Sequence, residues 1–373
     1  MSDEVPPGGK SADVRALSLL DELARTAHGG NERFSAALID LFHPGGYRLN
    51  EFECVLMRRL LDQLVAAVED DLRVRLLVAP EVAESEGFCA SLGAGHVAIA
   101  RPILDRARLL HDPDLVAALL RRSDEYTIVK RLRADAVVAE NGVLGNLLES
   151  DDKRLVEAAM RLLIAESRRN DRFDAPLLAP GDLHVAVHRR LVWNTAAALR
   201  EYGIREHGLD APGLDRAMVE AGEAVLAEQT RGETLESAAM ILAEALAAIG
   251  DSVLVEALSG ARLALYVALL ARRTDIGFEA ALDIACDPQV GRHAALLRST
   301  GVGRDAAAHL LLTLERATRE DQGAGETLAA QWIEIYDALP CEAAREAVLQ
   351  WRSHNGYYSA LSALSGAMGG PAR

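Results

Sequence analysis

The chain has 373 residues, which on a prior of about 150 residues per domain gives two domains or one elongated array. Ala and Leu contribute 65 and 57 residues, whereas Phe, Trp and Tyr together contribute 16. Because Ala and Leu favour helices while aromatic and β-branched residues favour strands, the composition excludes an all-β sandwich or barrel. The formal charge of −16 repels phosphate backbones, so we expect no nucleic-acid partner.

The N-terminal segment is expected to be disordered over residues 1–10 and helical beyond them. It carries acid, Pro and Gly where a signal peptide needs a basic start and an apolar run. Ser11 and Asn31 can cap two helices, and Asn50 with Glu53 forms a capping-box pattern for a third helix through Val68. Since no stretch reaches 18 apolar residues without a charge, we expect no membrane insertion and a cytoplasmic location.

Beyond residue 70 the pattern changes to short amphipathic helices separated by turn signals. Asp112, Pro113 and Asp114 supply an N-cap, an N1 proline and an acid at a helix start. Further turn signals are Asp70 with Asp71, Asp124 with Glu125, Asn141 with Gly142, Asp151 with Asp152, and Pro180 to Asp182. Helix starts that combine apolar and basic residues recur along the chain. The intervals between them are irregular and shorter than the HEAT period of about 40–47 residues. The pattern predicts an all-α fold of stacked helical hairpins, HEAT-like with an irregular repeat, after the N-terminal helical group.

The longest helix is expected over residues 182–202. Residues 208–213, GLDAPG, contain Gly and Pro without apolar periodicity, which predicts a hinge or linker. This joint would separate an N-terminal helical region, 11–207, from a C-terminal helical region, 214–364. Helices in the second region are expected at 214–229, 234–249, 260–272, 276–286, 290–299, 304–319, 324–338 and 341–352, before a disordered tail at 365–373.

Two histidines on the predicted 182–202 helix are candidate functional residues. His184 and His188 have the spacing by which paired helical histidines bind zinc, but Val185 replaces the Glu of zincins and no third ligand is evident. We therefore assign no metal. His188, followed by Arg189 and Asn194, also resembles the phospho-accepting helix of histidine kinases and phosphotransfer proteins, a role that needs an exposed imidazole and a polar group to orient it.

Other chemical motifs are incomplete. Gly93, Gly95 and Ala98 match the pattern G-x-G-x-x-A, but no β-rich segment precedes them, so we expect a turn between helices instead of a dinucleotide site. Walker A, G-x-S-x-G and H-E-x-x-H sequences are missing, and we expect neither a catalytic residue nor a cofactor. The cysteines are widely scattered, as is typical of reduced thiols in a cytoplasmic protein: Cys54, Cys89, Cys286 and Cys341.

Large aromatic residues are scarce in this chain, so each of them is considered as a candidate contact residue for a partner. Trp193 lies near the middle of the predicted 182–202 helix, where it either anchors a partner or packs in the core. Tyr357 and Tyr358, near the C-terminus, are candidates for a terminal docking element.

Two stretches of the chain resemble an uncharacterised bacterial family that is catalogued only as a domain of unknown function. Residues 97–104 (VAIARPIL) and 109–115 (LLHDPDL) are similar to its VA-x-P-V-L and L-L-x-D-x-D-L patterns. Residues 182–200 are similar to its D-L-P … W-V-x-x-A-L-R helix, although His184 replaces the Pro, and Asn194 and Thr195 stand where the family has small or apolar residues. The resemblance covers residues 55–315 and implies a HEAT-like array in a cytoplasmic bacterial protein with no catalytic residues assigned.

Stacked helices without a complete catalytic constellation favour a non-enzymatic regulatory or scaffold protein that binds another protein through a helical-repeat surface. The alternative is a signalling relay or sensor, which would use phosphotransfer at His188 or bind a nucleotide messenger between helices. A protein partner is expected, and a homodimer stays open. The candidate interaction residues are His188, Arg189, Trp193, Tyr357 and Tyr358.

Overall fold

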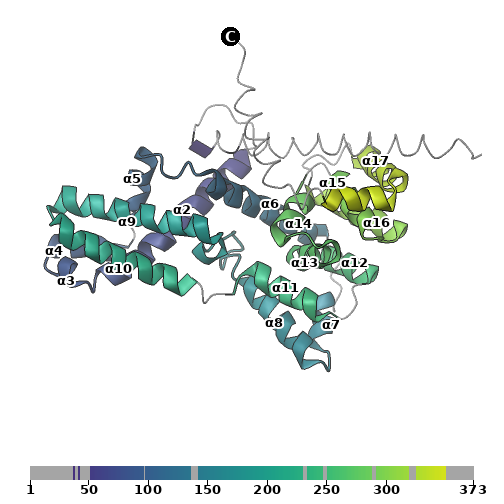
Figure 1. The fold of residues 1–373 in the computed structure, drawn as a ribbon, viewed down its shortest axis with the longest axis horizontal. Coiled ribbons are helices and arrows are strands. Elements are labelled where there is room, and N and C mark those ends of the chain that lie inside the picture. Colours follow the sequence, from purple (N-terminus) through teal and green to yellow (C-terminus); the bar gives the residue numbers. More distant parts are fainter. Residues whose placement is uncertain are drawn as a thin grey trace, which may run out of the picture. The chain divides into compact units, whose positions relative to one another are not determined.

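The computed structural model of the chain is built from helices (Figure 1). It describes residues 51–95, 97–135, 142–229, 233–246, 250–287, 291–318 and 325–349, together with Ala37, Leu41 and Phe42. Every regular element in these ranges is a helix, which confirms the all-α prediction. The HEAT-like repeat stays a prediction. None of the helices in the described ranges is both long and apolar enough to cross a bilayer.

The helices follow one another closely along the chain. Their bounds are α2 (Glu51–Leu76), α3 (Pro80–Ala83), α4 (Glu86–Gly93), α5 (Ala100–Arg106), α6 (Pro113–Asp135), α7 (Val143–Leu148), α8 (Lys153–Ser167), the 3-10 helix η1 (Pro180–Asp182), α9 (Val185–His207), α10 (Ala211–Gln229), α11 (Leu235–Ala245), α12 (Asp251–Ser259), α13 (Leu263–Thr274), α14 (Phe278–Ala285), α15 (Gly291–Ser299), α16 (Arg304–Thr318) and α17 (Gly325–Ala338). Residues 341–349 are also helical. The predicted helices of the C-terminal region match these positions, except that α12 was missed.

The described helices form two compact units. One unit contains the described residues of 36–123 and 165–234, and we call it the α9 unit. The other contains the described residues of 124–164 and those from 235 onward, and we call it the α13 unit. Each unit therefore combines parts of both predicted regions, 11–207 and 214–364, and the predicted domain boundaries stay predictions. The predicted joint at 208–213 falls within one unit and is shorter than expected. Residues 208–210 connect α9 to α10, and Gly208 ends α9 in the left-handed conformation. Ala211, Pro212 and Gly213 form the first turn of α10, because Pro is tolerated in the first turn of a helix.

Helix α2 is longer than α9, with 26 residues against 23, so the prediction of the longest helix at 182–202 is wrong. Asp70 and Asp71 do not form a turn, because α2 continues to Leu76. Leu72 and Leu76 prolong the buried face of the helix, and their burial outweighs the low helix propensity of Asp. Asp124 and Glu125 likewise lie inside a helix, α6.

A buried ion pair on α2 holds the start of α5. Glu69 and Arg73 are both buried and paired with each other. The Glu69 carboxylate accepts hydrogen bonds from the backbone N of Ile99 (2.9 Å) and Ala100 (3.0 Å), which are among the unpaired donors of a helix N-terminus. Arg73 donates to the carbonyl of Val97 at 2.5 Å. The pair thus joins α2 to the segment before α5 and satisfies backbone groups that burial would otherwise leave unpaired.

In the α9 unit, α9 and α10 lie side by side, and α2 packs against both (Figure 1). In the α13 unit, α13 is the central helix, because its residues Leu263 to Ala271 are all buried and it packs against α11, α12 and α14. A helix that is apolar on all sides is expected only in such a central position. Arg272 at its C-terminal end donates to the carbonyl of Leu246, just after α11, at 2.6 Å.

The core of the α13 unit contains a buried polar pair. The Tyr266 hydroxyl lies 2.5 Å from Nε2 of His293, and both side chains are buried. Burial lowers the pKa of His293 to about 3 and raises the pKa of Tyr266 well above its usual value. Both groups are therefore neutral at physiological pH.

We predict that His293 makes the folded state sensitive to acid. Its pKa is about 6.5 when unfolded and about 3 when folded, so the unfolded state binds the proton first and stability falls as the pH drops through this window. Between pH 6.5 and 5 this residue alone should cost up to about 1.4 kcal/mol per pH unit. Urea denaturation at several pH values measures the slope. The double variant Tyr266→Phe/His293→Leu should have a shallower slope, and an unchanged slope would contradict the assignment.

Candidate functional site

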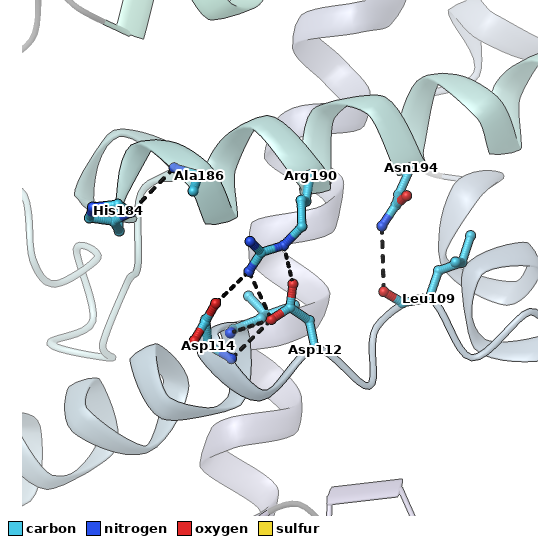
Figure 2. Close-up of polar contacts among 8 residues, drawn as sticks. Leu109, Asp112, Asp114, His184, Ala186, Arg190 and Asn194 are labelled. Carbon is cyan, nitrogen blue, oxygen red and sulfur yellow. Dashed lines mark hydrogen bonds and ion pairs between the residues drawn. The ribbon is translucent and has the colours of Figure 1, made fainter. Parts of the chain in front are cut away.

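Four of the predicted candidate residues lie at the start or in the N-terminal half of α9: His184, His188, Arg189 and Trp193. This part of α9 faces the start of α6 (Figure 2). His184 precedes α9 and caps it, because its Nδ1 accepts a hydrogen bond from the backbone N of Ala186 at 3.3 Å. His184 is exposed, whereas His188 is buried. The spacing of four residues does not place both on one helix face, since His184 has a non-helical backbone. The described residues contain no group of three or more His, Cys, Asp or Glu that could hold a metal ion.

His188 is only 2% exposed and lies close enough to α2 to interact electrostatically with Asp71. Burial raises the pKa of the Asp71 carboxyl, and Arg75 opposes this shift. A phospho-accepting imidazole must meet its phosphoryl donor at the surface. The His188 side chain lacks the exposure that the relay alternative requires.

Arg190 connects α9 to the start of α6 (Figure 2). Its Nε lies 2.5 Å from one carboxylate oxygen of Asp112 and its Nη2 lies 3.0 Å from the other. Nη2 also lies 2.7 Å from Asp114, and these hydrogen bonds, the Asp112 bond above all, raise the pKa of Arg190. Asp112 also accepts a hydrogen bond from the backbone N of Asp114 at 2.9 Å, as predicted for an N-cap. The two stretches that resemble the bacterial family thus meet at this contact.

Asn194 does not orient His188. Its Nδ2 donates to the backbone carbonyl of Leu109 at 3.5 Å (Figure 2). This weak hydrogen bond is a second polar contact between α9 and the segment that leads into α6. The polar residues of this face of α9 therefore connect helices.

Trp193 is half-buried and its ring packs against α10. A Cβ atom on Gly222 would lie 2.5 Å from Cζ3 and 2.9 Å from Cη2 of Trp193, so only a glycine leaves room for the ring. The arrangement fits the packing interpretation of Trp193. Its role as a partner anchor stays a prediction.

The remaining candidate interaction residues lie in different surroundings. Arg189 is exposed on α9, next to the buried His188. Tyr357 and Tyr358 lie outside the described residues. Arg189 and His188 therefore differ in burial although they are adjacent in the sequence.

A hydrogen-bonded hairpin at residues 169–177 was not predicted from the sequence. The Asp171 carboxylate accepts hydrogen bonds from the backbone N of Phe173 (2.8 Å) and Ala175 (2.9 Å). The backbone bonds from Ala175 and Phe173 lower the pKa of Asp171, and the backbone N of Asp171 donates to the Ala175 carbonyl at 2.8 Å. Phe173 at the tip is 75% exposed, and the Arg172 guanidinium lies 4.6 Å from its ring centre. The closely spaced Asn and Asp residues before Pro176 were the available turn signal.

The base of this hairpin is fixed by the buried Arg122 of α6. Its guanidinium donates to the carbonyls of Leu177 (2.9 Å) and Arg169 (2.5 Å) and to the Asn170 side chain (3.0 Å). Three bonds from one planar group hold both arms of the hairpin. Phe173 is therefore presented on a well-ordered support.

A serine and a histidine also meet in the α13 unit, between α12 and α16. The Ser259 hydroxyl lies 3.1 Å from Nε2 of His309, which is the distance of a nucleophile and its base. Within the described ranges no carboxylate is hydrogen-bonded to the other ring nitrogen of His309. Without an orienting group, the pair alone does not form a nucleophilic site.

We predict that the Arg190 side chain stabilises the folded protein and that the side chain of Arg189 does not. Arg190→Ala should lower the free energy of unfolding by about 1 kcal/mol, since it removes a forked ion pair at a half-exposed position. Arg190→Lys should recover only part of this loss, because a single ammonium cannot bridge both carboxylates. Urea denaturation is the measurement, and Arg189→Ala is the matched control. Equal stability of the two alanine variants would contradict the role of Arg190.

We also predict that Gly222→Ala destabilises the protein by about 1–3 kcal/mol, because the added methyl group collides with the Trp193 ring. The same change should be neutral or favourable in a Trp193→Leu background, where Ala gains from its helix propensity. Thermal and urea unfolding of the four variants measure this coupling. Gly93→Ala is the control, since a Cβ there meets nothing within 4 Å. A Gly222→Ala variant as stable as the parent would refute the contact.

Comparison with known protein families gives a match over most of the chain. Residues 99–348 match the family DUF2336, which is described as an uncharacterised protein conserved in bacteria. No curated protein and no solved structure matches the chain. The matched segment starts and ends later than the 55–315 segment of the resemblance noted above, and it includes both α6 and α9. It spans well over half of the chain, which therefore belongs to the bacterial family DUF2336.

Proposed function

We propose that this chain is a non-enzymatic regulatory or scaffold protein of the cytoplasm that binds another protein through its helical surface. The observation that carries the proposal is the exposed Phe173 at the tip of the 169–177 hairpin. A large aromatic side chain exposed on an ordered support is the kind of residue that anchors protein interfaces.

The order of the hairpin supports this role. Because Asp171 and Arg122 already fix the backbone around Phe173, a partner would not have to order the loop, and less binding energy is lost. The neighbouring Arg172 guanidinium adds a positive charge at the rim. The matching partner surface is an apolar pocket with a carboxylate near its edge.

The helical packing supports a stacked array as part of the same proposal. Consecutive helices pack against each other in the pairs α9 with α10, α13 with α14 and α16 with α17. Arrays of this kind present extended surfaces to other proteins. The HEAT-like description is proposed on this basis.

The proposal is tested by removing the Phe173 ring. Phe173→Ala should reduce capture of the partner by at least about tenfold, the loss expected for a central aromatic anchor. The measurement is quantitative mass spectrometry of proteins that co-purify with the full chain at native expression. Val219→Ala, at an exposed aliphatic residue of α10, is the control and should capture the partner like the parent. Identical profiles for the parent and Phe173→Ala would contradict docking at this residue.

A further inference from the structure

One face of α2 is exposed to solvent from Val55 onward. Residues at spacings of three and four form a continuous helical stripe: Val55, Arg59, Asp62, Ala66, Asp70 and Val74, with Val78 just beyond the helix end. Val74 and Val78 are 67% and 81% exposed, which is unusual for aliphatic side chains that follow one another at this spacing. We call this set the α2 stripe. At 1.5 Å per residue it is about 35 Å long.

The side chains of two α2 stripes are complementary when the two helices run antiparallel. Apolar residues occupy both ends, and between them Arg59 lies four residues after Val55 while Asp70 lies four residues before Val74. Two antiparallel copies would therefore place Val55 opposite Val74 and Arg59 opposite Asp70 of the second copy. A two-fold interface repeats each of these contacts, so every favourable pair occurs twice.

The charges along the stripe favour this pairing. Asp62 is already paired with Arg101 at 2.7 Å, and Arg75 with Glu228 at 2.7 Å. Asp70 has no ion-pair partner among the described residues, and it lies beside Asp71, another carboxylate. The half-exposed Arg59 contacts Asp171 at 3.3 Å and can reach a further carboxylate. A parallel pair would instead oppose Arg59 to Arg59 and Asp70 to Asp70, which is repulsive.

We infer that the chain forms a homodimer in which the α2 stripes of two copies pack antiparallel, with Arg59 of each copy paired to Asp70 of the other. Ala66 lies near the centre of the stripe, where a small side chain lets two helices approach closely. The contact is smaller than a standard interface, so we expect a dissociation constant in the micromolar range. The inference does not depend on docking at Phe173.

The test is sedimentation velocity of the full chain at several concentrations up to about 100 µM. Arg59→Glu and Asp70→Arg should each raise the dissociation constant about tenfold, because two symmetric pairs become repulsive. The double variant Arg59→Glu/Asp70→Arg should return it to within about threefold of the parent. Arg189→Glu, a charge reversal on α9, should leave it unchanged.

The apolar ends are tested with Val74→Glu, which should abolish the dimer, and with the control Val219→Glu, which should not. Both positions are exposed, so neither change should affect folding, and circular dichroism checks this. A parent protein that stays monomeric at all concentrations, or a double reversal as weak as the single variants, would overturn the inference. Phe173→Ala should dimerise normally, so failure of this inference can be told apart from failure of the partner-binding proposal.

Discussion

The structure depends on how its many helix ends are satisfied. Short helices leave carbonyl groups without intrahelical partners at every C-terminus, and burial makes each unpaired group costly. Arginine side chains supply the missing donors in the α13 unit. The Nη1 of Arg131 donates to the Ala317 carbonyl at 3.1 Å, and the Nε of Arg298 donates to the Leu339 carbonyl at 2.8 Å. These bonds connect the end of one helix to the side of another, so they also fix the packing.

In the α9 unit, Arg73 and Arg122 each donate to two backbone carbonyls, one of them at the end of α4 and the others in the segments between helices. A guanidinium has five donors in a planar fork and stays charged, whereas a lysine ammonium is a single point. Only three of the 40 basic residues are Lys, an excess of Arg from which the sequence alone supports no binding inference. These four arginines use several donors of the fork to fix helix ends and connecting segments in place.

The sequence predicts those features of the structure that depend on residues close together in the chain, and it does not predict those that depend on distant residues. Apolar periodicity and caps are local, so α15, α16 and the Asp112 cap were predicted correctly. The end of α2 was misplaced because Leu72 and Leu76 gain their burial from helices distant in the sequence. The burial of His188 and the clamp of Arg122 on residues 169–177 are likewise tertiary, and no local pattern indicates them. The sequence pointed to this part of α9 as a candidate site. It could not show that His184 caps the helix, that Arg190 bridges two aspartates or that Trp193 packs against α10, because these roles depend on contacts in the folded chain.

The polar groups with the strongest chemistry are used within the fold. Arg190 bridges two aspartates, His184 caps a helix, and His293 is neutral and paired with Tyr266. Groups held in this way are already hydrogen-bonded, so their removal should affect stability before any interaction with a ligand. Phe173 and the α2 stripe are different, because their apolar side chains remain in contact with water at a free-energy cost. Burial against another protein chain would relieve that cost, and this is the physical basis of both binding proposals.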